Sequence, residues 1–227
     1  MMNETILVIA AHPDDEMLGC GGTIRLLVDA GAEAHVAFLA DGVSSRDQDK
    51  KEEDELSVRR SAARKSCDIL GIKDIFFGEF PDNRMDTVAL LDIVKCVENL
   101  INQYKPDIVF THHAGDLNVD HRRVHEAVIT ACRPQTGHPV HTLLFFEIPS
   151  STEWQIPGSG LAFEPNWFRD ITSTLERKLE ALDAYAVEMR KWPHPRSREG
   201  IEHLAKWRGA TVGVSAAEAF MLGRRLK

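Results

Sequence analysis

The chain has 227 residues, of which 43% are hydrophobic, 27% charged and 7% aromatic. Acidic residues outnumber Lys and Arg by 35 to 27, so the formal net charge is −8 at pH 7. This acidic balance argues against binding to nucleic acid or to anionic membranes, because both require a positively charged surface. The apolar fraction argues against a disordered chain. Ten histidines accompany the many carboxylates, which raises the question of whether the two residue types cluster around a metal.

The cysteines and the amino-terminal residues predict a cytoplasmic protein. Cys20, Cys67, Cys96 and Cys132 show none of the short, repeated spacings of a disulfide framework or a cysteine-based zinc site. The apolar run 6–11 is too short for a signal peptide. No segment approaches the roughly 20 apolar residues needed to cross a bilayer, so no membrane insertion is expected. A homo-oligomer is compatible with the sequence.

Strands and helices are predicted to alternate along the first part of the chain. The run 6–11 is uniformly aliphatic, as in a strand buried on both faces of a parallel sheet. A helix is expected at 19–30, ended by Gly31. Further strands are expected at 35–40, 74–77, 107–111 and 142–148, with a loop at 41–50 and helices at 52–70, 87–104 and 119–132. This order predicts an α/β fold with a Rossmann-like, doubly wound, mostly parallel sheet and helices on both faces.

The composition changes after residue 149. Residues 150–166 are rich in Ser, Pro and Gly and predict a loop, and 171–190 predicts a helix. Pro193 and Pro195 then interrupt the chain before a final stretch, and all four tryptophans lie in this last third. We predict a single domain, 1–227, with a C-terminal embellishment of helices and loops that begins at about residue 150.

A dense polar string, Ala11-His12-Pro13-Asp14-Asp15-Glu16, follows the first predicted strand. Ligands of open α/β sheets bind outside the carboxyl ends of the strands, so chemistry is expected here. His12 and Asp15 are close enough in a tight turn to converge on zinc or another divalent metal. The neighbouring Asp14 would stay free to act on a water molecule. The alternative interpretation is that the acids cap the following helix.

Gly19, Gly21 and Gly22 support a competing interpretation, a metal-free nucleotide-binding module. A glycine-rich turn between a strand and a helix can hold a pyrophosphate. The spacing here is Gly-x-Gly-Gly rather than Gly-x-Gly-x-x-Gly, and the acids just before it would repel phosphate. The sequence therefore favours the metal site.

A histidine cluster follows the fourth predicted strand, with four of the ten histidines within residues 112–125. In a parallel sheet this segment can lie beside the loop after the first strand. His121 could then join His12 and Asp15 as a third protein ligand and leave the fourth position open, as in catalytic zinc sites. Asp120 is expected either to orient a histidine ring or to cap the helix that begins here, and the cap is the preferred interpretation.

These two segments resemble the PIG-L/LmbE-like family of zinc-dependent N-acetyl-sugar deacetylases. The Ala-His-Pro-Asp-Asp-Glu string is the most specific motif of that family and is complete here. The second motif of the family is typically His-x-Asp-His, and here it reads Asn118-Val119-Asp120-His121. The resemblance implies a metal-dependent N-deacetylase that hydrolyses the acetamide of a small-molecule N-acetyl sugar.

The resemblance also implies roles for individual residues. His12, Asp15 and His121 would bind zinc, and Asp14 would be the general base. Two further residues, Arg59 and Asp82, match family residues that contact the substrate.

Asn118 departs from the family pattern, because the family has a histidine there that stabilises the oxyanion or protonates the leaving amine. Asparagine can donate a hydrogen bond but supplies no proton at neutral pH. The candidates for the proton donor are Asp14 once protonated, His112, His113, His125 and His194. His194 is expected to be held rigidly by Pro193 and Pro195 and to reach the substrate.

Three hypotheses follow for the function. The first is a zinc-dependent hydrolase acting on an N-acetylglucosamine-type conjugate or a nucleotide-linked amino sugar. The second is the metal-free nucleotide-binding module. The third is a non-catalytic sugar-binding homologue, in which Asn118 marks lost catalysis.

Overall fold

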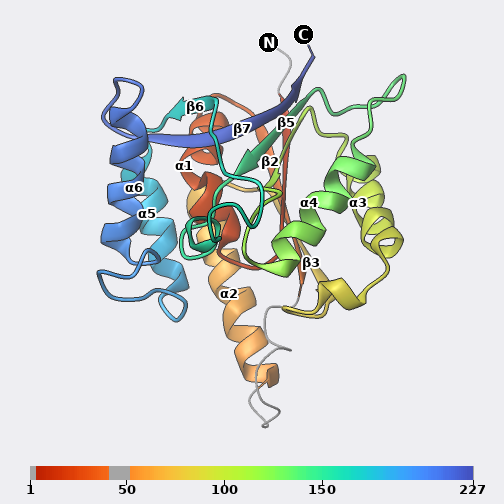
Figure 1. The fold of residues 1–227 in the computed structure, drawn as a ribbon, viewed down its shortest axis with the longest axis horizontal. Helices are drawn as coiled ribbons and strands as arrows, with labels where there is room; N and C mark the ends of the chain where they lie inside the picture. Colours follow the sequence, from red (N-terminus) through yellow and green to blue (C-terminus); the bar gives the residue numbers. More distant parts are fainter. Residues whose placement is uncertain (1–3, 41–51, 227) are drawn as a thin grey trace.

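The computed structural model describes residues 4–40 and 52–226, without the side chains of residues 52–54. It contains a seven-stranded mixed sheet between two layers of helices (Figure 1). The strands are β1 (Thr5–Ala10), β2 (Glu33–Ala40), β3 (Asp74–Phe80), β4 (Ile108–His112), β5 (Thr142–Phe146), β6 (Trp167–Asp170) and β7 (Ala217–Arg225). The α-helices are α1 (Asp15–Asp29), α2 (Glu52–Leu70), α3 (Leu90–Tyr104), α4 (Val119–Ala131), α5 (Leu175–Leu182) and α6 (Arg198–Ala210). Short 3₁₀ turns span Met85–Thr87, Thr152–Trp154 and Asp183–Tyr185.

The strand order is β3-β2-β1-β4-β5-β7-β6. Strands β1 to β5 pair in parallel, whereas β7 runs antiparallel to both of its neighbours. The prediction of a mostly parallel α/β sheet is therefore confirmed. The chain builds outward from β1 in one direction to β2 and β3 and then restarts on the other side with β4. Such a reversal leaves a crevice at the carboxyl ends of β1 and β4, where ligands of open sheets bind.

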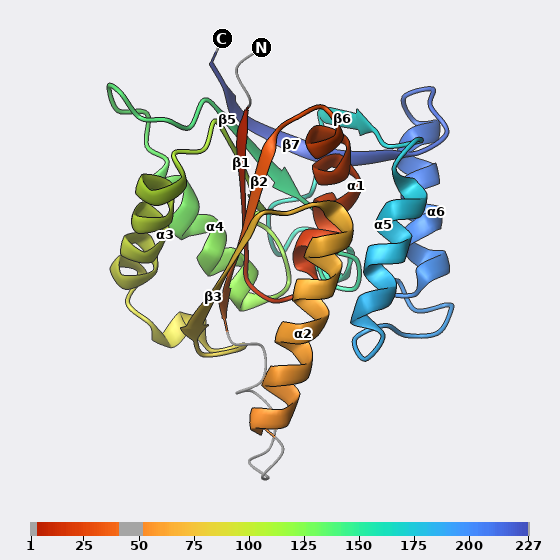
Figure 2. The same ribbon diagram turned by 180° about the vertical axis from the view of Figure 1, so that it is seen from behind.

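The side chains of β1 alternate between two hydrophobic cores, as expected for a strand buried on both faces. Ile6 and Val8 belong to the core that includes residues of α1, α2 and α5. Leu7 and Ile9 belong to the core that includes residues of α3 and α4. Figure 2 shows these two helical layers on opposite faces of the sheet. None of the described helices combines the length and apolar character that crossing a membrane requires.

Helix α1 begins at Asp15, four residues before its predicted start. The glycine group therefore lies inside a helix and forms no strand-to-helix turn. A Cβ atom on Gly19 would lie 2.5 Å from the ring of Phe146, and one on Gly22 would lie 2.9 Å from Ile171. These glycines allow close packing against α1. The predicted loop 41–50 lies outside the described residues.

The prediction of a single helix over 171–190 is wrong. The segment contains α5 and a 3₁₀ turn, and the preceding residues form β6. Asp170 Oδ1 accepts hydrogen bonds from the backbone N–H (2.9 Å) and hydroxyl (2.6 Å) of Thr172. This local turn competes with helix formation, so the helix begins only at Leu175. The residues after 150 also add β6 and β7 to the sheet, which the expected embellishment of helices and loops did not include.

Candidate active site

A polar cavity of about 260 Å³ lies beside the segments that follow β1 and β4. It is lined by His12, Asp14, Asp15, Arg59, Asp82, Asn83, Asn118, His121, Ser150, Ser151, Glu188 and Arg196. Seven of the eight site residues that the sequence predicts are among them, and only His194 is not. The fold therefore brings the two sequence motifs to one place.

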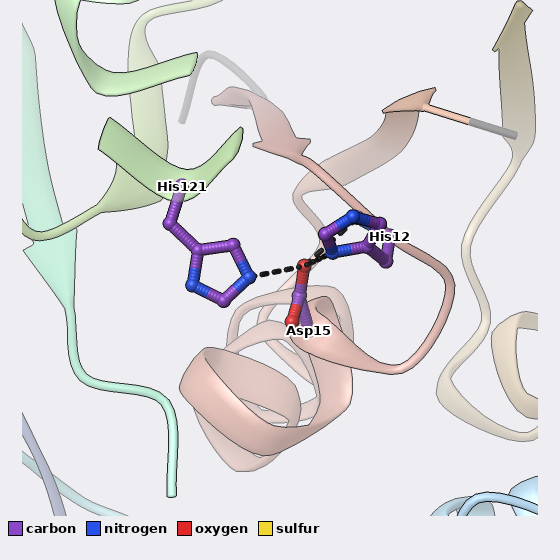
Figure 3. A group of neighbouring side chains, drawn as sticks. All are labelled: His12, Asp15 and His121. Carbon is purple, nitrogen blue, oxygen red and sulfur yellow. Dashed lines mark hydrogen bonds and ion pairs between the residues drawn. The ribbon is translucent and has the colours of Figure 1, made fainter. Parts of the chain in front are cut away.

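His12, Asp15 and His121 form a compact group at the cavity (Figure 3). Nδ1 of His12 lies 3.5 Å and Nε2 of His121 lies 3.4 Å from the same oxygen, Asp15 Oδ2. One ligand atom from each residue lies within 4.8 Å of the others, a spacing at which they could hold a metal ion. The three side chains are almost fully buried.

Two further carboxylates face the outer nitrogens of the two histidine rings. Asp120 Oδ2 lies 3.0 Å from His12 Nε2, and Asp116 Oδ1 lies 3.0 Å from His121 Nδ1. A carboxylate in this position fixes the ring orientation and tautomer of a metal-binding histidine. The remaining nitrogen of each ring is then directed toward Asp15. The donor set therefore fits a divalent cation.

The electrostatics of the group also suit a cation. Burial alone would lower the pKa of His121, but Asp15 and Asp116 raise it to about 9. The carboxylates around His12 likewise raise its pKa well above its usual value despite burial. Protonated histidines are thus stabilised at this point by the surrounding negative charge. A divalent metal would supply that positive charge instead.

Asp14 is held in a strained conformation at the edge of this group. Its φ of 115° lies in the left-handed region that non-glycine residues rarely adopt. Its backbone N–H donates to Glu16 Oε2 at 3.1 Å, and its Oδ2 accepts from Arg196 Nη1 at 3.1 Å. Burial raises the pKa of Asp14 to about 7, although Arg196 opposes the shift. A carboxyl with this pKa is suited to exchange protons near neutral pH.

Backbone strain is concentrated at the cavity. Four described non-glycine residues have positive φ, and three of them, Asp14, Asn83 and Ser150, line the cavity. Such conformations persist only where the surrounding structure enforces them, and they cluster at functional sites.

Asn118 caps α4 and reaches across the cavity. Its Oδ1 accepts from the backbone N–H of Asp120 at 2.8 Å, and its Nδ2 donates to Asn83 Oδ1 at 3.1 Å. The prediction that Asp120 caps this helix is therefore wrong. Asp120 instead accepts hydrogen bonds from the backbone N–H groups of Asn83 (2.6 Å) and Met85 (3.0 Å). Asp120 thus connects the segment after β3 to His12 through hydrogen bonds.

The three remaining predicted substrate contacts have different surroundings. Arg59 forms an ion pair with Glu188 at 2.7 Å, and Asp82 Oδ1 lies 3.0 Å from His12 Nε2. His194 lies outside the cavity lining, where its Nδ1 accepts from the backbone N–H of Arg196 at 3.0 Å. It therefore shapes the segment that carries Arg196.

The other histidines considered as proton donors do not line the cavity. His112 Nε2 accepts a hydrogen bond from the backbone N–H of Ala11 at 2.8 Å. His113 Nε2 lies 2.9 Å from the carbonyl oxygen of Leu161, and His125 Nδ1 lies 2.8 Å from the carbonyl oxygen of His112. These rings tie loops and strands together.

Sequence reasoning missed five lining residues, namely Asn83, Ser150, Ser151, Glu188 and Arg196. A signal existed only for Arg196, which follows the proline-bounded His194 by two residues. Of the segment that the prolines are predicted to hold rigidly, Arg196 rather than His194 lines the cavity.

Residues 7–132 match the family model described as PIG-L, GlcNAc-PI de-N-acetylase. The matched segment exceeds half of the chain and contains both motifs of the cavity. The chain belongs to the PIG-L family. The resemblance noted from the two motifs is thereby confirmed.

Relatives of this PIG-L chain include deacetylases and a hydratase. The diacetylchitobiose deacetylase of Thermococcus kodakarensis is 30% identical over 191 residues, which are 78% of this chain and 67% of the relative. The 4-oxalmesaconate hydratase of Pseudomonas putida is 28% identical over 248 residues, covering 99% of this chain and 88% of the relative. The structure of the N,N'-diacetylchitobiose deacetylase from Pyrococcus horikoshii has the same fold, with a TM-score of 0.79, 21% identity and coverage of 98% of this chain and 85% of that one.

Proposed function

We propose that the chain is a zinc-dependent N-deacetylase that releases acetate from a small-molecule N-acetyl sugar. The substrate would be an N-acetylglucosamine-type conjugate or a nucleotide-linked amino sugar. The observation that carries the proposal is the convergence of His12, Asp15 and His121 on one point of a polar cavity, with Asp14 beside them. The deacetylase relative supports the same class of reaction.

In this proposal His12, Asp15 and His121 hold the ion. When bound, zinc supplies Lewis acidity, which polarises the acetyl carbonyl and lowers the pKa of water. Asp14 takes a proton from the water molecule as the water oxygen attacks the amide carbon. Asn118 has a second amide hydrogen besides the one donated to Asn83, and in this proposal donates it to the oxyanion.

The leaving amine needs a proton, because an amide nitrogen departs only as a neutral amine. Among the described residues, no histidine other than the two proposed ligands lines the cavity. We therefore assign the return of the proton to Asp14. Arg196 holds the Asp14 carboxylate in place at 3.1 Å.

The test combines metal analysis with an acetate-release screen over N-acetylglucosamine, diacetylchitobiose and a nucleotide-linked N-acetylglucosamine. We expect about one zinc per chain and acetate release by the wild type. Asp14→Asn should keep the zinc and lose activity by roughly 10²–10⁴-fold. A protein that purifies without stoichiometric metal and ignores chelators would support the nucleotide-binding module instead. Sugar binding without acetate release at saturating zinc would support the non-catalytic homologue.

A second candidate is the addition of water to an unsaturated carboxylate, as the name of the hydratase relative suggests for that protein. Two arginines line the cavity, and arginine binds carboxylates well. Both already have a carboxylate partner, since Arg59 pairs with Glu188 and Arg196 with Asp14. The deacetylase is therefore the stronger proposal. Loss of the ultraviolet absorbance of a conjugated dienoic acid, with no acetate release from any sugar, would reverse this preference.

A further inference from the structure

The first turn of α1 carries Asp15 into the cavity, and the helix is interrupted shortly afterwards. At Cys20 the backbone leaves the helical region, with φ −146° and ψ 15°. The backbone N–H of Leu18 donates to the carbonyl oxygen of Asp14 at 2.9 Å, so Leu18 lies one turn after Asp14. The interruption thus separates a short segment bearing site residues from the longer, core-packed part of α1.

A buried ion pair lies against this interruption. Lys178 Nζ on α5 is 2.6 Å from Glu218 Oε1 on β7, and the two side chains are only 3% and 4% exposed. Glu218 accepts hydrogen bonds from the backbone N–H groups of Gly22 (2.9 Å) and Thr23 (2.7 Å). Lys178 donates to the carbonyl oxygen of Leu18 at 2.9 Å. The pair therefore binds backbone groups on both sides of the interruption.

The charges of the pair match the two helix ends that they face. The amino end of a helical segment favours a carboxylate, and its carboxyl end favours a cation. Glu218 faces the N–H groups that begin the second segment, and Lys178 faces a carbonyl that ends the first. Replacing a buried ion pair with apolar residues is often neutral for stability. The backbone contacts of the pair, rather than its contribution to stability, are therefore the basis of the proposal below.

Gly21 and Gly22 of α1 lie next to Lys178 and Thr174. A Cβ atom on Gly21 would lie 2.4 Å from Met17 Sδ and 3.7 Å from Lys178 Cγ. The Lys178 stem thus passes over a helix surface that has no side chain. In addition, Thr174 Oγ1 donates to the carbonyl oxygen of Gly22 at 2.8 Å. Gly22, one of the glycines that suggested nucleotide binding, is therefore in close contact with the C-terminal part of the chain.

The beginning of the first turn of α1 is also held by the C-terminal part of the chain. The hydroxyl of Tyr185, just after α5, donates to Glu16 Oε1 at 2.7 Å. The other oxygen of Glu16 accepts from the backbone N–H of Asp14 at 3.1 Å. The turn that carries the site residues is therefore fixed at its beginning through Tyr185 and at its end through Lys178.

We propose that the Lys178–Glu218 pair positions Asp14 and Asp15 by fixing the interruption in α1. Neither residue of the pair lines the cavity, so both are positioning residues that act through the backbone of α1. The inference rests on the proposed function, because it takes Asp14 as the base and Asp15 as a zinc ligand.

The main test is the double variant Lys178→Met/Glu218→Gln. Methionine keeps the apolar stem, glutamine keeps an acceptor for α1, and no unpaired charge remains buried. We expect zinc binding, measured by competition with a chromophoric chelator, to weaken about tenfold, in line with the loss of groups that orient metal ligands. Native-state hydrogen exchange at residues 15–19 should accelerate, and kcat should fall with little change in KM.

The matched control is Glu147→Gln/Arg208→Met. This pair also joins the C-terminal part to the rest of the fold, with a contact of 2.6 Å between Arg208 Nη2 and Glu147 Oε2. It should lose thermal stability and keep wild-type zinc affinity. Unchanged zinc affinity and exchange in the Lys178/Glu218 double variant would overturn the proposal. So would an equal loss of zinc affinity in the control.

Thr174→Val covers the case in which the double variant does not fold. It removes one neutral hydrogen bond to the interruption and leaves no buried charge. Faster exchange at residues 15–23 is expected, with a loss of stability of only about 1 kcal/mol. Unchanged exchange would mean that side-chain contacts from the C-terminal part do not fix the interruption, and would overturn the proposal. If the wild type binds no zinc or releases no acetate, the proposed function fails, whereas hydrogen exchange still decides whether the pair fixes α1.

Discussion

The guanidinium of Arg196 contacts the carboxylate of Asp14 across 182 positions of sequence, with Nη1 at 3.1 Å from Oδ2. The contact joins the strained turn after β1 to the segment between α5 and α6. A second arginine of the cavity, Arg59, forms an ion pair with Glu188. The C-terminal part of the chain therefore contributes directly to the candidate active site.

Removing this contact should impair catalysis more than binding. We expect Arg196→Met to lower kcat by about 10–100-fold with a smaller change in KM, because the carboxylate loses the group that fixes its orientation. Arg198→Met is the control, since Arg198 is partly exposed and pairs with Asp183 at 2.9 Å. It should stay within about twofold of the wild type. A change confined to KM would indicate that Arg196 contacts the substrate only.

Asn118 combines two roles that a pair of substitutions can separate. Asn118→Ala removes both the cap of α4 and the amide donor, and should destabilise the fold by about 1 kcal/mol and lower kcat. Asn118→Asp keeps the capping oxygen but loses the donor to Asn83. It should retain the melting temperature and lose activity. Wild-type activity in Asn118→Asp would remove the amide donor from the mechanism.

Asp116 should control metal affinity without being a ligand. It lies 3.0 Å from His121 Nδ1 and is held by Thr152 Oγ1 at 2.6 Å. We expect Asp116→Asn to weaken zinc binding by roughly 10–100-fold, measured by chelator competition, because the ring of His121 loses its orienting charge. Asp170→Asn, at an exposed turn, is the control. Equal affinities in the two variants would contradict this role.

Metal removal should lower the melting temperature. A ligand at 100 times its dissociation constant stabilises the folded state by about 2.7 kcal/mol. For a chain of this size that corresponds to a shift of about 5–10 °C on adding zinc to chelator-treated protein. His121→Ala removes one of the three proposed ligands and should abolish the shift. A shift that persists in this variant would place the zinc elsewhere.

The cysteines provide a check on the core that is independent of function. All four are free, and Cys20, Cys67 and Cys132 are buried. Burial raises the pKa of Cys132 to about 12 and those of Cys20 and Cys67 well above their usual values, so their reactive thiolates are scarce at pH 8. Burial also raises the pKa of Cys96, but this thiol is only half-buried, so a thiol reagent at pH 8 should modify it before the other three in the native state. All four should react after unfolding in guanidinium chloride.

Local patterns in the sequence were sufficient for the first half of the fold and the metal-ligand candidates. The aliphatic run of β1 predicts a strand buried on two sides, and this alone places the following turn at the carboxyl edge of the sheet. The spacing of His12 and Asp15 within that turn then makes a shared cation plausible. The structure brings His121 to the same point because β1 and β4 are neighbours.

Contacts between distant segments explain what the sequence could not predict. The interruption of α1 depends on Glu218, which lies 196 positions from Gly22. Asn118 caps α4, because the carboxylate of Asp120 accepts hydrogen bonds from the backbone N–H groups of Asn83 and Met85 instead. Arg196 reaches Asp14 only through the arrangement of α5, α6 and the segment between them. None of these contacts leaves a periodic or local signature.

The pairing of β6 determines the order in which the sheet can be completed. Among the described strands, β6 pairs with β7 alone, and Trp167 stands opposite Phe220. Strand β6 can therefore gain a backbone partner only after α5, α6 and β7 have been synthesised. Strand β7 must in turn dock antiparallel on β5. Closing so long a loop is slow relative to local helix formation. Assembly of the site should thus finish late, since Glu218 lies on β7. A nascent chain stopped before β7 should contain both motifs without fixing their positions.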